Sequence, residues 1–214
     1  MVQFSELKGK KFVNNLKIIL KDLEPFIRAV KPLWNSPPFP NFSLRVREAW
    51  TLWLLCAALN RMRGLDLTFG EDDESSSDGI LLDKRTMEFI KTENVATMDF
   101  PSTNFPRGEK RIIAAIMSKI QKGHEYAKGK ILTVFFDGAH QWHRNKVREA
   151  INGKHHFEQI FLIGLVTDHN ATEWEYSVTE LEENTSTTFI VKITPDFTDW
   201  SVTLFPNLPT PQKI

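Results

Sequence analysis

Apolar residues recur every three or four positions in two stretches near the start of the chain. In the first, residues 5–31, lysines separate the apolar positions, which is typical of an amphipathic helix, and Pro25 is expected to interrupt it. The second follows a proline-rich loop at 34–43 and runs to about Arg63. It is apolar in almost every direction, so we predict a helix that is buried on most sides.

Shorter apolar runs predict strands in the middle of the chain. Turn residues separate three extended segments, at 65–69, 79–82 and about 86–95. The acidic sequence GEDDESSS forms a polar loop between the first two segments. The break at 83–85 is short enough to join neighbouring antiparallel strands.

The second half of the chain alternates helices with buried strands. Its pattern predicts two helices, at 109–127 and 139–151, and two fully buried strands, at 131–136 and 157–166. Alternating polar and apolar residues then predict three strands with one solvent-facing side, at 173–181, 188–194 and 201–205. This order predicts an α/β fold with a central mixed β-sheet flanked by helices and a strand-rich C-terminal part.

Length and composition suit one domain. The chain has 214 residues, of which 41% are hydrophobic, enough for a sizeable core. Within a single domain over 1–214 we expect an N-terminal helical extension at 1–42, a core at 43–166, additional strands at 167–206 and a loose tail at 207–214.

The cysteine content and the first residues favour an intracellular protein. Cys56 is the single cysteine, so it has no partner for an internal disulfide. The start of the chain lacks a basic segment followed by an apolar block, as a secretory signal would have. The most apolar run, 49–59, is shorter than the about 20 residues that span a bilayer. We expect a soluble, cytoplasmic protein.

Basic residues concentrate in one segment, although lysines plus arginines and aspartates plus glutamates both number 27. Between 107 and 130 there are seven basic residues and two acidic ones, whereas 168–199 holds eight acidic residues and one lysine. We expect the basic segment to face phosphate groups, with a solvated helix face as the alternative. The expected nucleic-acid contacts are Arg107, Lys110, Arg111, Lys119 and Lys122.

The stretch DGILLDKRTMEFIKTENV, residues 78–95, places two carboxylates and a lysine on two successive predicted strands. Phosphodiester hydrolysis uses a hard cation such as Mg²⁺, which takes one or two carboxylates as ligands beside water and phosphate. A nearby lysine can stabilise the charge that develops. We therefore expect Asp78 and Glu88 to hold Mg²⁺, or Mn²⁺ in its place, with Lys91 beside them.

Asp78 in SSDGILL, Glu88 in TMEFIKTE and the order of the elements resemble the PD-(D/E)xK nuclease superfamily, which includes many type II restriction enzymes. The resemblance covers roughly residues 43–166 and implies a restriction-endonuclease-like core. It implies a metal-dependent endonuclease that acts on DNA, often as a homodimer. The catalytic residues that it implies are Asp78, Glu88, Lys91 and the accessory acid Glu48.

Several alternatives remain open. Lys91 follows Glu88 by three residues where the family has two, so a regular strand would point them to opposite faces unless a bulge realigns them. In a second registration, Glu93 is the strand carboxylate and Lys91 shares its face. Glu48 could also be a first-turn acid that faces water. The alternative function is a catalytically inactive nuclease-like module for nucleic-acid binding or assembly.

Other chemistry has less support. The histidines could form a transition-metal site, although surface positions explain them more simply; they are His140, His143, His155 and His156. The chain lacks the GxxxxGK[ST] loop that cradles phosphates and the GxSxG elbow of serine hydrolases.

Overall fold

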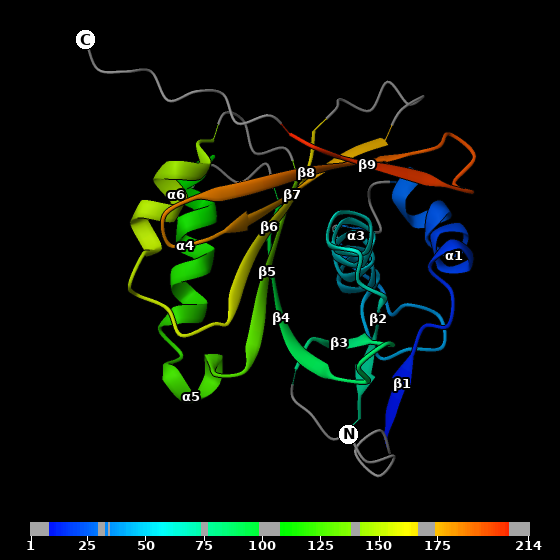
Figure 1. Ribbon diagram of the computed structural model, residues 1–214, viewed down its shortest axis with the longest axis horizontal. Coiled ribbons are helices and arrows are strands. Elements are labelled where there is room, and N and C mark those ends of the chain that lie inside the picture. The colour runs from blue at the N-terminus through cyan, green and yellow to red at the C-terminus, as the bar shows by residue number, and fades with distance from the viewer. Residues whose placement is uncertain are drawn as a thin grey trace.

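A nine-stranded mixed sheet with helices on both faces is the frame of the protein (Figure 1). The computed structural model describes residues 9–29, 33, 35–73, 77–98, 108–137, 142–166 and 174–205. The helices are α1 (Leu16–Arg28), α3 (Val46–Arg63), α4 (Glu109–Ile120), α5 (His124–Ala127) and α6 (Arg144–Ile151). The strands are β1 (Lys10–Phe12), β2 (Leu67–Asp72), β3 (Gly79–Asp83), β4 (Phe89–Met98), β5 (Lys130–Asp137), β6 (Gln159–Leu165), β7 (Trp174–Leu181), β8 (Ser186–Ile193) and β9 (Trp200–Leu204).

The strands lie side by side in the order in which they occur in the chain. β4, β5 and β6 run parallel to one another, and every other neighbouring pair is antiparallel. The parallel strands are joined by α4 and α5 in one connection and by α6 in the next, as parallel pairing requires a crossover. The predicted α/β class with a mixed sheet flanked by helices is therefore confirmed.

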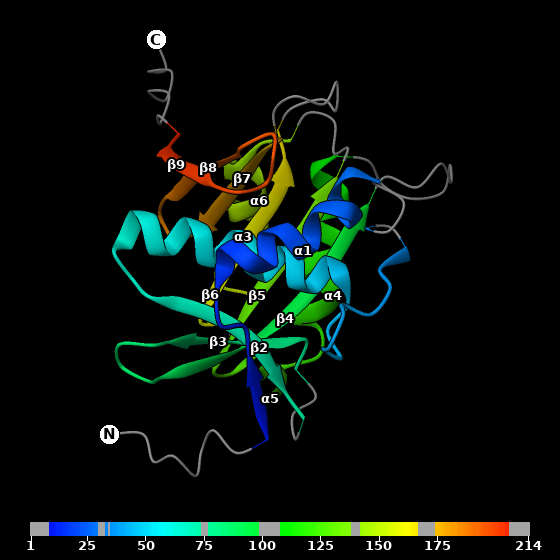
Figure 2. The same ribbon diagram turned by 90° about the vertical axis from the view of Figure 1, so that its right-hand side faces the viewer.

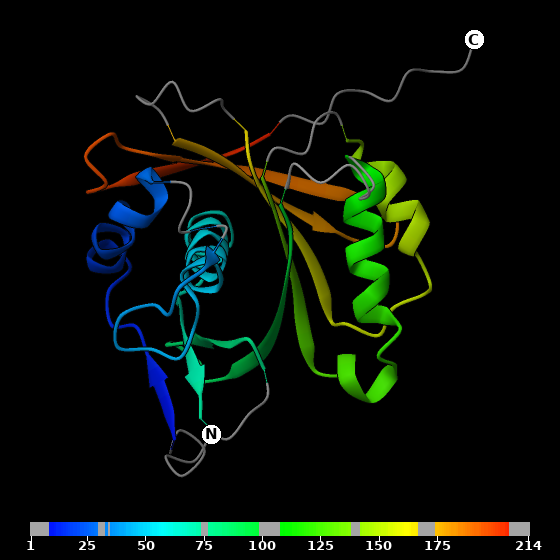
Figure 3. The same cartoon turned by 180° about the vertical axis from the view of Figure 1, so that it is seen from behind.

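The two faces of the sheet carry different helices. Figures 1 and 3 show α4, α5 and α6 on one face and α1 and α3 on the other. In Figure 2, α1 and α3 lie in front of the central strands. Each face has its own apolar core, one around α3 and a smaller one beneath α4 and α6.

α3 is enclosed because the sheet bends around it, with β2 and β3 on one side and β8 and β9 on the other (Figure 1). Every residue from Ala49 to Leu59 is buried. An apolar surface on all sides of a helix needs such an environment, because no face is left for water. The prediction of a helix buried on most sides is confirmed.

The start of β3 packs tightly against α3. At Gly79 the backbone has φ +153°, and an added Cβ would lie 2.6 Å from Leu52 Cδ1 and 3.2 Å from Thr92 Oγ1. Glycine is therefore required both by the backbone conformation and by the space. This contact fixes the position of the preceding residue, Asp78, relative to α3.

Some predicted boundaries are wrong. The segment 5–31 was expected to be helical, but residues 10–12 form β1, which pairs with β2, and the helix begins at Leu16. Pro25 lies inside α1 without ending it. The first three residues of the predicted acidic loop belong to β2, since Gly70, Glu71 and Asp72 pair with β1. Among the described residues, no helix is both long and apolar enough to cross a membrane.

Candidate active site

Asp78 lies where the chain enters β3, and its side chain is held at β4. Its backbone N–H donates to Thr92 O at 3.0 Å, and its Oδ2 accepts from the backbone N–H of Asn94 at 2.8 Å. Gly79 pairs with Thr92, so the residue directly across from Asp78 on β4 is Glu93. Cross-strand neighbours of this kind project side chains to the same face of the sheet.

A single lysine joins the two carboxylates. Lys119, near the end of α4, places its Nζ 3.1 Å from Glu93 Oε2 and 3.5 Å from Asp78 Oδ2. α4 packs on the sheet over β4 and β5, so a side chain from its last turn can reach the two carboxylates. The Asp78–Glu93 pair therefore converges on one ammonium group.

Glu93 has two further partners on the same face. Lys130 at the start of β5 places its Nζ 2.8 Å from Glu93 Oε1, and the Tyr126 hydroxyl on α5 donates to Glu93 Oε2. The side chain of Glu93 is only 3% exposed, whereas that of Asp78 is 32% exposed. Glu93 thus forms the floor of the site and Asp78 its solvent-facing edge.

The local charges set the protonation states. Burial alone would raise the pKa of Glu93, but hydrogen bonds from Lys130 and Tyr126 and the charge of Lys119 outweigh burial and lower it. Burial would lower the pKa of Lys119, but Tyr126 and the two carboxylates outweigh it and raise it. Burial and the hydrogen bond to Glu93 raise the pKa of Tyr126 to about 12. At neutral pH Glu93 is therefore ionised, Lys119 is charged and Tyr126 keeps its proton.

Glu48 approaches from the other face, in the first turn of α3. Its Oε2 accepts from the backbone N–H of Arg45 at 2.8 Å, so it caps its own helix. Burial raises the pKa of Glu48, and the negative charge of Asp78 raises it further, while the Arg45 N–H opposes both. Glu48 is therefore a half-buried acid in the first turn of α3, and the charge of Asp78 contributes to its raised pKa.

The Asp78–Glu93 pair suits a hard cation. Two carboxylates with water and substrate phosphate are the usual ligands of Mg²⁺ in proteins. The space between them already accommodates the positive charge of Lys119. Within the described ranges, no three acidic, histidine or cysteine side chains converge as a metal-ligand set. An ion here would thus depend on Asp78 and Glu93 with water and phosphate.

The structure does not bring Glu88 to Asp78, so Glu93 takes the place that was expected for Glu88. Glu88 lies in the turn before β4, where its backbone O accepts from Asp83 N, at the far end of β3. Asp78 and Asp83 are separated by five residues of strand, or roughly 16 Å. Glu88 is exposed at this turn. The expectation that Asp78 and Glu88 share an ion conflicts with this register.

Lys91 shares the face of Glu93, as the second registration expected. The pairing of β3 with β4 is regular from Gly79 to Leu82, with Ile80 opposite Lys91, so no bulge realigns Lys91 with Glu88. Lys91 is partly exposed, and the ammonium that meets the carboxylates is that of Lys119 instead.

The expected nucleic-acid contacts divide into three groups. Lys119 belongs to the site itself, and Lys122 donates to the Tyr126 hydroxyl at 3.3 Å. Lys110 is exposed and Arg111 partly exposed at the start of α4, about two turns from Lys119. Arg107 lies outside the described residues.

Sequence reasoning missed the roles of Tyr126 and Lys130 and read Lys119 only as a phosphate contact. These residues follow Glu93 by 26 to 37 positions. The concentration of basic residues at 107–130 indicates that this segment is positively charged. It does not indicate that Lys119, Tyr126 and Lys130 meet at Glu93.

Among the histidines that the structure describes, no three ligands gather into a metal site. His124 and His156 pack ring against ring with centroids 4.7 Å apart, while His143 pairs with Glu109 at 3.2 Å on another surface. Burial lowers the pKa of His155, which lines a different cavity. His140 lies outside the described residues.

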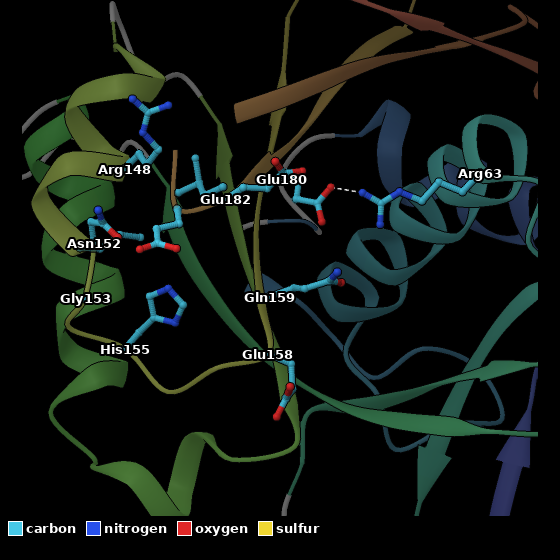
Figure 4. Close-up of a pocket in the computed structure, with 12 residues that line it drawn as sticks. Arg63, Arg148, Asn152, Gly153, His155, Glu158, Gln159, Glu180 and Glu182 are labelled. Carbon is cyan, nitrogen blue, oxygen red and sulfur yellow. Dashed lines mark hydrogen bonds and ion pairs between the residues drawn. The ribbon is translucent and has the colours of Figure 1, made fainter. Parts of the chain in front are cut away.

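A cavity of about 610 Å³ lies apart from the Asp78–Glu93 pair and shares no residue with it (Figure 4). Arg63 of α3 reaches Glu180 of β7 on one side, and His155 points into the cavity from the loop after α6. Acidic, basic and amide side chains are mixed along its wall, and a ligand class does not follow from this mixture. An open groove of about 810 Å³ adjoins it and contains Glu88.

Comparison with known proteins gives no relative: no family model, curated protein or solved structure matches the chain. The assignment of function therefore depends on the geometry of the site.

Proposed function

We propose that the protein is a metal-dependent nuclease that hydrolyses DNA phosphodiester bonds at Asp78, Glu93 and Lys119. The observation that carries this proposal is the convergence of Asp78 and Glu93, from adjacent strands, on the Nζ of Lys119 at 3.5 and 3.1 Å. Two carboxylates and a lysine are the groups that metal-assisted phosphodiester hydrolysis needs.

The order of elements around the site supports the same proposal. A helix, three antiparallel strands, a helix and a parallel strand follow one another as α3, β2, β3, β4, α4 and β5. This is the order expected of a restriction-endonuclease-like core, with the acids at the corresponding places. Glu48 on the first helix, Asp78 directly before the second strand and Glu93 on the third fit that scheme, with the lysine supplied by α4.

The side chains have distinct tasks in this proposal. Asp78 and Glu93 would hold Mg²⁺ or Mn²⁺, which would polarise the phosphate and lower the pKa of an attacking water. Lys119 stabilises negative charge that develops on phosphate oxygen, because its ammonium stays charged in the site. Lys130 keeps Glu93 ionised at the floor of the site. Lys122 and Lys110 supply positive charge along the approach to it.

Cleavage of plasmid DNA tests the site directly. We expect nicking or linearisation with Mg²⁺ or Mn²⁺ and none with EDTA. Asp78→Asn and Glu93→Gln should each lower the rate at least about 100-fold, because each removes a metal ligand. Glu88→Gln is the matched control and should cleave like the wild type.

Two outcomes would contradict the assignment. Undiminished cleavage by folded Glu93→Gln would exclude Glu93 as a metal ligand. Loss of cleavage in Glu88→Gln alone would instead support Asp78 and Glu88 as the metal ligands. Lys119→Met and Lys91→Met form a second matched pair, in which only the first should slow cleavage. Light scattering of the protein with DNA would show whether the expected homodimer forms.

An inactive nuclease-like module that binds nucleic acid is the second candidate. It is favoured by one observation, that Glu93 is already neutralised by Lys119 and Lys130 and is almost fully buried. Calorimetric titration with Mn²⁺ in the presence of DNA separates the two candidates. Binding of DNA without any binding of Mn²⁺ would favour the module.

A further inference from the structure

Tyr126 stands at the centre of the lysines that surround Glu93. Its hydroxyl donates to Glu93 Oε2 and accepts from Lys119 Nζ at 3.1 Å and from Lys122 Nζ at 3.3 Å. A phenol oxygen can donate one hydrogen bond and accept others, so these contacts are compatible with one protonated hydroxyl. The hydroxyl thus connects the buried carboxylate with two ammonium groups.

The ring of Tyr126 holds two of the neighbouring lysines by a second interaction. The Nζ atoms of Lys122 and Lys130 lie 4.4 and 4.5 Å from the ring centroid, within the range of cation–π attraction. Phe157 packs edge-on against the ring, with centroids 6.2 Å apart at 84°. The phenol is therefore oriented by the apolar core on one side and by charge on the other.

We propose that Tyr126 is a positioning residue that keeps Lys119 at the Asp78–Glu93 pair; this rests on the proposed function. A lysine side chain has four rotatable bonds, so a useful location of its ammonium depends on anchors. The anchors of Lys119 are Asp78, Glu93 and the Tyr126 hydroxyl. If the two carboxylates serve as metal ligands, the hydroxyl is the anchor that remains for the ammonium.

A double-mutant cycle in DNA cleavage tests this role. Tyr126→Phe keeps the ring and removes the hydroxyl, and we expect kcat to fall about 10-fold with little change of KM for DNA. In a Lys119→Met background the same substitution should cost almost nothing, because Tyr126 acts through Lys119. An equal loss in both backgrounds would overturn the proposal. Tyr176→Phe, in the other apolar core, controls for loss of a tyrosine hydroxyl.

A second measurement does not depend on activity. Acetylation of lysines by limiting acetic anhydride, followed by peptide mass spectrometry, reports how accessible each amine is. Lys119 should react faster in Tyr126→Phe than in the wild type, relative to exposed Lys128 in the same sample. An unchanged ratio would overturn the positioning role. If wild-type protein does not cleave DNA but this ratio rises, the proposed function fails and the anchoring of Lys119 by Tyr126 stands.

Discussion

Glu93 is a buried carboxylate that is stabilised by side chains from three different elements. Lys119 comes from α4, Tyr126 from α5 and Lys130 from β5. Removing one member of such a buried ion-pair network strongly destabilises the fold, because the remaining charges are left without a partner in a poorly solvated place. Glu93 therefore links the stability of this face of the sheet to the chemistry of the site.

Acid should weaken the protein through Glu93. The pKa of Glu93 in the folded state lies below its ordinary value of 4.5. Its ion pairs therefore stabilise the fold fully above about pH 5, and this stabilisation is lost as the pH falls through the folded-state pKa. Glu93→Gln should lower the free energy of unfolding by about 2–4 kcal/mol at pH 7. The difference from wild type should shrink at pH 3.

Urea unfolding of both proteins between pH 3 and 7, followed by circular dichroism, measures this effect. Glu88→Gln serves as the control, because Glu88 is exposed and lies in the turn before β4. A difference between Glu93→Gln and wild type that stays constant over this pH range would contradict the expected protonation.

At the scale of elements, the contact between α3 and β3 places Asp78. Gly79 lets the strand pass close to Leu52, and the neighbouring Asp78 then meets β4 at Thr92 and Asn94. A small shift of β3 against α3 would move Asp78 relative to Glu93. The packing of one glycine thus bears on the geometry of the site.

Gly79→Val should destabilise the protein by about 2–4 kcal/mol. The added side chain would overlap Leu52 Cδ1, which lies 2.6 Å from the position of a Cβ, and φ is strained for any residue except glycine. Gly153→Ala is the control, because no atom lies within 4 Å of its added Cβ at φ +68°. It should cost about 1 kcal/mol. Equal melting temperatures for the two variants would show that the Leu52 side chain can move aside and make room for valine.

Elements with a strong local pattern could be predicted from the sequence. The buried strands β5 and β6 and the helix α4 have continuous or periodic apolar residues, so their type follows from nearby residues alone. β1 could not be predicted in this way. It has three residues, and the residues of β2 with which it pairs lie 58 to 62 positions further along the chain.

The candidate site was predictable only in part. The sequence pattern places Asp78 directly before a strand and offers Glu93 as an alternative to Glu88 on the next strand. It favours Glu88 because it predicts that the turn ends at residue 85, whereas β4 begins at Phe89. The convergence of Lys119 and Tyr126 on Glu93 depends on how α4 and α5 cross the sheet. Spacing along the chain contains no such information.

At the scale of the whole molecule, the last three strands complete the core around α3. Trp50 packs against Tyr176 of β7 with centroids 5.2 Å apart, and Trp53 packs against Trp200 of β9 at 5.0 Å. Trp50 and Trp53 are fully buried. The strands that were expected as additions to a core at 43–166 therefore belong to the same sheet and the same core.

A chain that ends at residue 166 should not fold. It lacks β7, β8 and β9, and several large apolar side chains of α3 would face water, at about 1.5–3 kcal/mol for each. A chain that ends at residue 205 keeps all nine strands and should melt like the full-length protein. Circular dichroism melting of both truncated chains measures this. A cooperative transition in the shorter chain would show that its core is independent.

Lys119 is the counter-ion of the two carboxylates within the protein itself. A metal ion that binds to these carboxylates therefore has to replace the Lys119 ammonium. For Asp78 and Glu93 to accept a metal ion, the Lys119 ammonium has to find another negative partner, and a DNA phosphate can supply it. Binding of Mn²⁺ and of DNA should then strengthen each other by the same factor. Titration of Mn²⁺ with and without DNA would measure this cooperativity. The cooperativity should be weaker in Lys119→Met, in which no ammonium has to be displaced.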